Sequence, residues 1–383
     1  MPGVPTPPHD AVPPRRDVQA GPPATRARSV RIVSPAPSDV WTSVWEASAE
    51  ATIFHRPEWL EACCQTAGFE NVSRLYETAD GERFVLPLAR SRSVRGTWRT
   101  AWSIPMGWGF GGAFGTRSLA ADDVALMLDE VLQASPRLVV NPGPVTRDAW
   151  TTVPGAVRVR HDTHVVDVRA GFDSLWSGIF SSDTRNKVRK SEKRGVEVEW
   201  GPGTVLMSVY WDVFLRWTRQ RAMERKIPTS LAVALAERRE PLIRYEAIAR
   251  HLGDRCQVAV ARVGGQPAAA VIVLLDGDHG HYWRAASDQA LVRRQYANHL
   301  LVARVLERAA QRGCSYVHMG ESGGKRTLIE FKEHFGAKPV SYHELRFGPR
   351  AVMAATQARE QLVRKAERLA VRSATRLRRS AAR

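Results

Sequence analysis

The two halves of this chain repeat one order of sequence features at a nearly constant distance. In each half a predicted hairpin with a glycine turn is followed by a long helix, a short buried strand and a closing strand. Landmarks in the hairpin, the buried strand and the closing strand lie 184, 177 and 179 residues apart. An offset this constant indicates two copies of one α+β unit. The landmark pairs are Gly81 and Gly265, Val139 and Tyr316, and His164 and His343.

The length of 383 residues also favours two domains, since single hydrophobic cores stop growing below that size. Residues 1–29 are rich in proline and nearly free of large apolar side chains, so we expect a disordered tail there. The first unit is predicted over residues 30–170 and the second over 171–348. Residues 349–383 predict a basic amphipathic helix, which could lie on an anionic membrane, bind nucleic acid or remain a solvated tail.

The charge of the chain is strongly basic. Lysine and arginine number 56 against 39 aspartates and glutamates, which gives a formal net charge of +17. Such an excess favours polyanionic partners such as nucleic acid, anionic lipid or phosphorylated ligands. The alternative is a basic surface that reflects an arginine-rich composition and binds nothing specific.

The cysteines predict neither a disulfide framework nor a metal site. The four are Cys63, Cys64, Cys256 and Cys314, and they show no CxxC or Cys/His ligand spacing. No stretch reaches the roughly 18 apolar residues that a membrane span needs. The start of the chain also lacks the apolar region of a signal peptide. We therefore expect a cytoplasmic protein without bound metal, with peripheral contact to an anionic membrane left open.

A basic stretch joins the two predicted units. Arg185, Arg189 and Lys193 recur at intervals of four residues, which places them on one face of a predicted helix. This face could bind the acceptor or a polyanion at the seam between the domains, where pockets are common. It could equally be a solvated basic surface.

The stretch from Cys314 to Phe347 combines a short strand, a glycine-rich loop, a charged helix and a closing strand. Four glycines, three lysines and several titratable side chains fall within it. A stretch that only formed part of a hydrophobic core would not contain so many glycines, lysines and titratable side chains. We interpret the stretch as one wall of an acyl-transfer site.

Several motifs, in this order, resemble those of two-unit GNAT-fold transferases. They are FxxPxWLxA near the start, THVVDV, RNKVRKSEKRGVEV, NHLL and FKEHFGAKPV. This group includes the Fem-type aminoacyltransferases of peptidoglycan bridges and the CelD-like GNAT N-acyltransferases, and the resemblance covers roughly Val30 to Phe347. It implies an α+β chain of tandem GNAT (acyl-CoA N-acyltransferase) folds, with mixed sheets flanked by helices. The active cleft would belong chiefly to the second unit, where the strands HYWRAAS and SYVHMGE would splay apart.

The catalytic candidates lie on or beside these two strands. Lys332 occupies a position where the Fem-like pattern also has a lysine, and the resemblance implies that it stabilises the donor or the tetrahedral intermediate. Glu321 could act as the base, or it could cap the next segment or pair with Lys325. His318 could be a base, although a strand histidine is often a packed residue. Tyr282 could donate a proton to the leaving group or belong to the core.

The donor would bind near the start of the long helix of the second unit. Simple acetyl-CoA GNATs hold the pyrophosphate with a glycine-rich loop at this place. The corresponding stretch here offers Arg293 and Arg294 but no glycine, with Asn298 opening the helix and Trp283 on the neighbouring strand. The resemblance implies no permanently bound cofactor, and acyl-CoA or aminoacyl-tRNA as co-substrate.

Three functions are compatible with these observations. The first is an N-acyltransferase that moves an acyl group from a thioester donor to an amine of an envelope or secondary-metabolite acceptor. The second is a Fem-like aminoacyltransferase that uses aminoacyl-tRNA and forms a peptide bond. The third is a non-catalytic member that binds RNA or a membrane through its basic helices.

Overall fold

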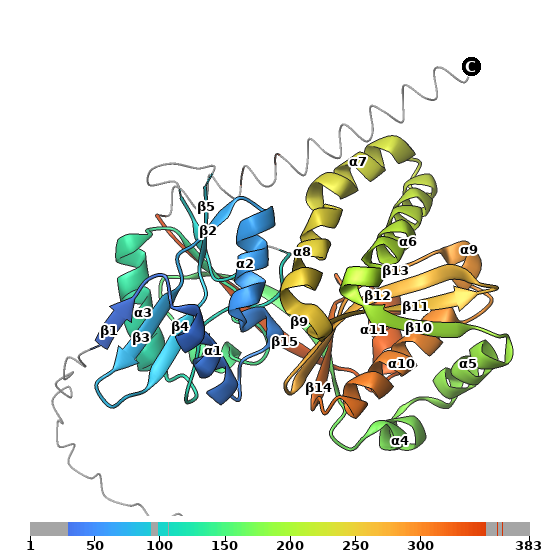
Figure 1. Cartoon of the computed structure of the whole chain (residues 1–383), viewed down its shortest axis with the longest axis horizontal. Helices are drawn as coiled ribbons and strands as arrows, with labels where there is room; N and C mark the ends of the chain where they lie inside the picture. The colour runs from blue at the N-terminus through green and yellow to red at the C-terminus, as the bar shows by residue number, and fades with distance from the viewer. Residues whose placement is uncertain (1–29, 93–98, 106, 350–357, 359–361, 363–383) are drawn as a thin grey trace, which may run out of the picture.

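The computed structural model describes residues 30–92, 99–105, 107–349, 358 and 362 (Figure 1). The predicted proline-rich tail, residues 1–29, lies outside the described residues. The predicted basic helix over 349–383 lies outside them as well, apart from three positions. No helix within the described part of the chain is long and apolar enough to cross a membrane.

The first half is a mixed arrangement of short strands and helices. The helix α2 begins with Pro57 at its first position, where the missing N–H costs nothing, and Gly68 follows its end in a left-handed conformation. The elements are β1 (Val30–Val33), α1 (Ser38–Ala47), η1 (Ile53–His55), α2 (Pro57–Thr66), β2 (Phe69–Asn71), β3 (Arg74–Thr78), β4 (Arg83–Leu86), β5 (Ala89–Ser91), β6 (Ala101–Trp102), β7 (Phe114–Gly115), α3 (Ala121–Ala134), β8 (Leu138–Val140), η3 (Arg147–Trp150) and β9 (Val157–Asp167).

The second half has longer strands and a helical layer on each face of its sheet (Figure 1). Helices α6 and α8 cover one face, and α10 with α5 covers the other. The elements are α4 (Phe172–Ser174), η4 (Leu175–Ile179), α5 (Ser182–Lys193), β10 (Glu197–Pro202), α6 (Gly203–Glu224), α7 (Thr229–Arg239), α8 (Leu242–Leu252), η5 (Gly253–Arg255), β11 (Cys256–Val263), β12 (Gln266–Asp276), β13 (His279–Ser287), α9 (Gln289–Val292), α10 (Ala297–Gln311), β14 (Tyr316–Glu321), α11 (Arg326–Glu333) and β15 (Lys338–Phe347).

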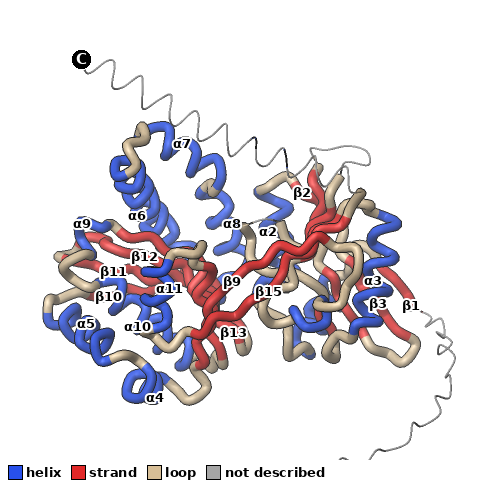
Figure 2. The backbone as a smooth tube through the Cα atoms, turned by 180° about the vertical axis from the view of Figure 1, so that it is seen from behind, coloured by secondary structure: helices blue, strands red, loops and turns tan. Residues whose placement is uncertain are grey.

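The two halves exchange their closing strands. In the larger sheet the strand order is β10-β11-β12-β13-β14-β9-β15-β8-β6-β5-β2. Strand β9 ends the first half but pairs with β14 of the second, and β15 ends the second half but pairs with β8 of the first. Figure 2 shows these two long strands crossing the middle of the molecule side by side. The exchange joins both halves into one continuous sheet, and it brings residues of the first half to the edge of β14.

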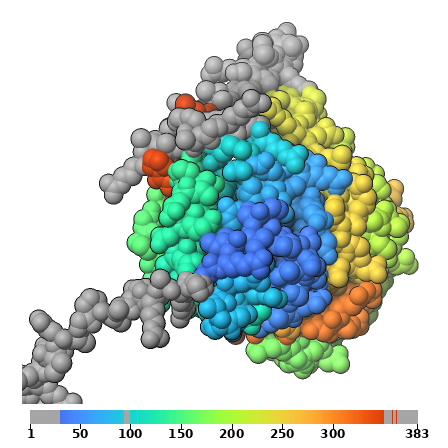
Figure 3. Space-filling model, turned by 60° about the vertical axis from the view of Figure 1, so that its left-hand side comes forward, coloured from blue at the N-terminus to red at the C-terminus, as the bar shows by residue number. Residues whose placement is uncertain are grey.

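A shared apolar core also joins the halves. Phe54 and Trp59 of the first half pack in one cluster with Tyr245 and Ile248 of α8. Figure 3 shows the blue surface of the first half directly against the yellow surface of this part of the second. The buried guanidinium of Arg56 forms an ion pair with the carboxylate at the end of β12. Because burial on both sides of the seam is extensive, the halves form one body.

Candidate active site

Strands β13 and β14 diverge after three paired positions. They run parallel and pair only from His279–Tyr316 to His281–His318. Beyond that point both strands leave regular pairing, because β13 has an irregularity around Trp283 and β14 has one between His318 and Glu321. The predicted splay of HYWRAAS and SYVHMGE is therefore confirmed, and it opens a gap in the middle of the sheet.

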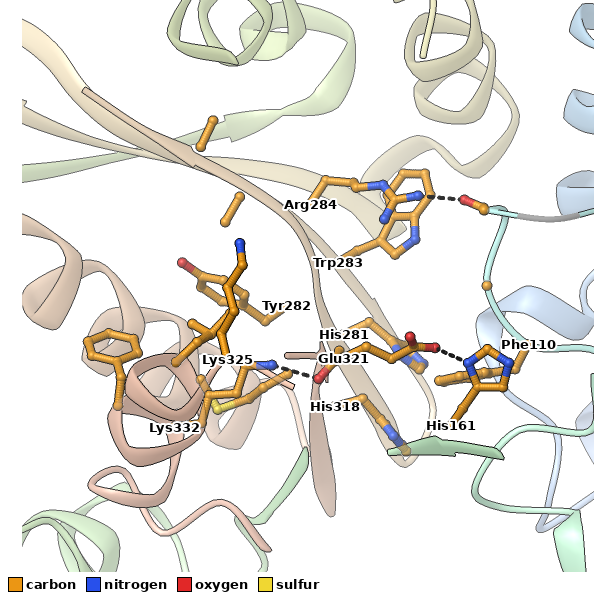
Figure 4. A pocket seen from close by; sticks show the side chains of 18 of the residues that line it. Phe110, His161, His281, Tyr282, Trp283, Arg284, His318, Glu321, Lys325 and Lys332 are labelled. Carbon is orange, nitrogen blue, oxygen red and sulfur yellow. Dashed lines mark hydrogen bonds and ion pairs between the residues drawn. The ribbon is translucent and has the colours of Figure 1, made fainter. Parts of the chain in front are cut away.

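A cavity of about 910 Å³ occupies this gap and reaches both faces of the sheet. Figure 4 shows side chains from both halves pointing into it. Six of the predicted site residues line it: Tyr282, Trp283, Asn298, His318, Glu321 and Lys332. The first half contributes Phe54, Ile104, Gly107, Gly109, Phe110, Asn141 and His161.

Lys332 is a buried lysine at the edge of the gap. It lies on α11 with 4% of its surface exposed, and its Nζ donates to the carbonyl oxygen of Gly320 over 2.6 Å. Burial lowers the pKa of Lys332 to about 8, against a smaller opposing effect of Glu321. The amine can thus exist in both protonation states near neutral pH, as acid–base chemistry requires.

Glu321 is held at the end of β14 by two donors. Its Oε1 accepts from the Tyr342 hydroxyl at 2.8 Å and from His161 Nδ1 at 3.1 Å. The hydrogen bond from His161, opposed in part by burial, lowers the pKa of Glu321. Glu321 is therefore an ionised carboxylate at the cavity wall.

His318 belongs to a cluster of buried histidines on the cavity floor. Its Nε2 lies 3.1 Å from His279 Nδ1, and its ring stacks on His281 with centroids 4.6 Å apart. Burial lowers the pKa of His318 to about 3 and that of His281 well below its usual range. A histidine with so low a pKa accepts a proton poorly, so this cluster provides neutral, polar walls.

Tyr282 and Trp283 face opposite sides of the sheet. Tyr282 packs on the α10 side, where burial raises the pKa of its hydroxyl. Trp283 packs on the first-half side, with its ring centroid 5.2 Å from that of Trp59. Beside it, Arg284 donates through Nη2 to the carbonyl oxygen of Gly107 over 2.6 Å, which ties the two halves together at the cavity (Figure 4).

The predicted donor-binding residues fall into two groups. Asn298 lies in the first turn of α10, lines the cavity and donates to Ser287 Oγ at 3.4 Å. Arg293 and Arg294 lie in the exposed turn that leads into α10 and do not line the cavity.

The basic residues of α5 lie outside the cavity lining. The Arg185 guanidinium donates to the carbonyl oxygens of Trp176 and Phe180 and so closes the end of the preceding π-helix. The Arg189 guanidinium lies 5.5 Å from the ring centroid of Trp176. Lys193 is exposed at the end of the helix. None of the three lines the cavity around Lys332.

The sequence-based prediction missed the contribution of the first half. It included the strand β15 in the wall of the site but did not single out Tyr342. His161, Phe110 and Tyr342 line the cavity, and the ring of Phe110 contacts those of both Tyr342 and His318. One signal was present in the sequence. The alternation VRVRHDTHVVD extends the strand back to residue 157, and it places His161 on the same face as Thr163.

The loop that carries Phe110 depends on close backbone packing. Gly109 has φ +105°, and a Cβ added there would lie 2.6 Å from the buried ring of Phe54. We expect Gly109→Ala to lower the free energy of unfolding by about 1–3 kcal/mol, since strain and overpacking combine. Denaturant unfolding measures this loss. Gly155→Ala is the matched control, because Gly155 also has positive φ but has open space around it. Equal losses in both variants would contradict the packing argument.

Among the described residues, no group of three or more histidine, cysteine, aspartate or glutamate side chains is arranged to hold a metal ion.

Comparison with known proteins finds a family match for part of the chain and a similar fold for most of it. Residues 180–333 match the family described as acetyltransferase (GNAT) domain. No curated protein sequence matches the chain. Solved structures similar to the chain include the following three.

The crystal structure of FemX aligns with a TM-score of 0.64 and 12% identity, over 85% of this chain and 99% of that one. A conserved protein of unknown function from Bacteroides thetaiotaomicron aligns with a TM-score of 0.52 and 11% identity, over 84% and 100% of the two chains. A tandem GNAT protein from the clavulanic acid biosynthesis pathway aligns with a TM-score of 0.48 and 13% identity, over 83% and 97%. We therefore identify residues 180–333 as a GNAT acetyltransferase domain within a chain that has the fold of FemX, and the protein as an acyltransferase.

Proposed function

We propose that the protein transfers an acyl group from a thioester donor of the acyl-CoA type to a primary amine. The observation that carries this proposal is the gap between β13 and β14, which has a buried lysine and an ionised carboxylate on one cavity. Acyl transfer to an amine needs a donor group for the developing oxyanion and a group that removes a proton. Lys332 and Glu321 supply these two functions.

The thioester enters from the face of the sheet that α10 and α11 cover. Asn298, Lys325 and Phe331 line this side. The first turn of α10, a helix of 15 residues, directs its unpaired N–H groups outward and favours an anionic group. Arg293 and Arg294 stand exposed beside that turn and attract the phosphates of the donor.

The amine enters from the first-half face and attacks the thioester carbonyl carbon. The carbonyl electron pair moves to oxygen, and the Lys332 ammonium donates a hydrogen bond to this oxyanion. Formation of the C–N bond makes the attacking nitrogen cationic and strongly acidic, so a carboxylate with a low pKa can accept its proton. Glu321 takes this proton. The intermediate then collapses, the C–S bond breaks, and the thiolate leaves with its electron pair to be protonated by solvent.

The experiment combines binding and turnover. We expect acyl-CoA to stabilise the protein by RT ln(1 + [L]/Kd), or about 2.7 kcal/mol at a hundredfold excess over Kd. We also expect thiol release that depends on an added primary amine. Glu321→Gln should keep the thermal stabilisation by acyl-CoA and lose the thiol release.

Two results contradict parts of the proposal. Transfer from aminoacyl-tRNA, without stabilisation or turnover by acyl-CoA, would replace the proposed donor. Full thiol release in Glu321→Gln would remove the proposed proton acceptor.

A further inference from the structure

We propose that His161, a residue of the first half, is a positioning residue of the transfer site that aims Glu321 at the amine. This inference rests on the proposed function, because it concerns the carboxylate that accepts the proton. It gives the first half a part in orienting the proposed proton acceptor, although the GNAT family match begins only at residue 180.

The register of three strands brings the group together. Glu321 pairs with Thr163 on β9, and Thr163 lies two residues from His161 on the same face of the strand. His161 in turn pairs directly with Tyr342 on β15. Paired residues point to one side of a sheet, so Glu321, His161 and Tyr342 all face the cavity.

The bulge in β14 is what turns Glu321 to this side. Two residues, Met319 and Gly320, stand against the single residue His164 of β9, and Gly320 takes φ +69°. Without the extra residue Glu321 would point to the opposite face, since a slip of one residue reverses every side chain. Bulges of this kind often re-aim a side chain beside an active site.

The contacts leave Glu321 one free carboxylate oxygen for the substrate. Within the described part of the chain, both donors to this carboxylate, His161 Nδ1 and the Tyr342 hydroxyl, bind Oε1. The ring of His161 stacks on that of Tyr342, with centroids 5.4 Å apart and planes 18° apart, so each donor supports the other. The carboxylate is thereby fixed with Oε2 left for the attacking amine.

The charges around the pair agree with this arrangement. The hydrogen bond between them raises the pKa of His161 and lowers the pKa of Glu321. The other charged groups that face the pair are Lys332 from α11 and Glu344 and Arg346 from β15. Lys332 acts on Glu321 in the same direction as His161 does. Proximity to opposite charge favours the ionised forms of both partners.

The kinetic test compares two substitutions of one residue. In His161→Phe the ring can still stack on Tyr342 but donates no hydrogen bond, whereas in His161→Asn the amide nitrogen can replace Nδ1 as donor. We expect His161→Phe to lower kcat about tenfold, because the Glu321 carboxylate is no longer held in its orientation toward the amine. The KM for acyl-CoA should be unchanged. His161→Asn should recover most of that loss. His343→Phe, on the adjacent strand and facing away from the cavity, is the control and should match the wild type.

Nuclear magnetic resonance tests the pairing without any turnover. Histidine labelled with 13C at Cε1 reports the pKa of His161, and His161→Asn identifies its signal. We expect a pKa above 6.5 in the wild type and a lower pKa in Glu321→Gln, because the neighbouring charge and its hydrogen bond are lost.

The outcomes separate the two proposals. Three results would each overturn the positioning role. They are a kcat of His161→Phe equal to that of the wild type, an equal loss of kcat in both His161 variants, and a pKa of His161 that is unchanged in Glu321→Gln. Absence of acyl transfer by the wild-type protein would instead overturn the proposed function. The titration would still show whether His161 and Glu321 are paired.

Discussion

Lys332→Met is expected to lower kcat/KM at least about a hundredfold, because removing one preorganised donor to an oxyanion typically costs that much. The methionine side chain keeps the length and the apolar stem that pack in the wall of the cavity. It cannot donate to the oxyanion, and it leaves only the carbonyl of Gly320 without its present donor. We therefore expect the loss in the rate constant and little change in thermal stability.

The pH dependence of the wild type gives a second sign of the same role. The pKa of Lys332 is lowered to about 8 by burial, so its ammonium form is present below that pH and disappears above it. If the ammonium is the donor, kcat falls as the pH rises through about 8, and Lys332→Met lacks this decline. Lys338→Met, at the exposed start of β15, is the matched control and should leave kcat unchanged. A variant at Lys332 with wild-type kcat would remove the lysine from the mechanism.

The fold could be predicted from sequence as far as local patterns reach. The hairpins, the long helices and the strands around Val139 and Tyr316 follow from periodicity and turn residues, and the structure confirms them. The exchange of β9 and β15 could not be predicted. Each strand has the sequence pattern of the last strand of its own half, and no residue within either strand specifies which neighbouring strand it pairs with. Pairing between distant strands depends on the whole sheet.

The candidate site could be predicted only where its residues belong to local sequence motifs. Lys332, Glu321 and His318 lie close in sequence, and their motifs lie on the strand and helix that border the gap. His161 is 160 residues from Glu321 and reaches it only through the strand exchange and the bulge at Gly320. For Arg185, periodicity placed it on a basic helix, but only the structure shows its guanidinium turned toward carbonyl groups.

Acidification is expected to destabilise the protein strongly, through histidines buried in neutral form. Burial lowers the pKa of His55 to about 4 and that of His318 to about 3, and it lowers that of His281 further still. In the unfolded chain these groups have pKa values near 6.5 and bind protons that the folded chain cannot bind. Their stabilising contribution is therefore complete above pH 6.5 and is lost as the pH falls toward the folded-state values.

Three such groups give a loss of about 4 kcal/mol in the free energy of unfolding between pH 8 and pH 5.5, which is a large share of the stability of most proteins. Urea unfolding across this range measures the slope. His318→Gln removes one of the groups and should reduce the loss by about 1.4 kcal/mol, while other histidines with lowered pKa values, such as His299, keep their contributions. His161→Asn should change the pH dependence of the unfolding free energy in the opposite direction. The pKa of His161 is raised in the folded state, so its stabilisation is present at low pH and is lost as the pH rises. Its removal should make the dependence steeper. A free energy of unfolding that stays constant from pH 8 to pH 5.5 would show that the three buried rings are not held neutral in the folded protein.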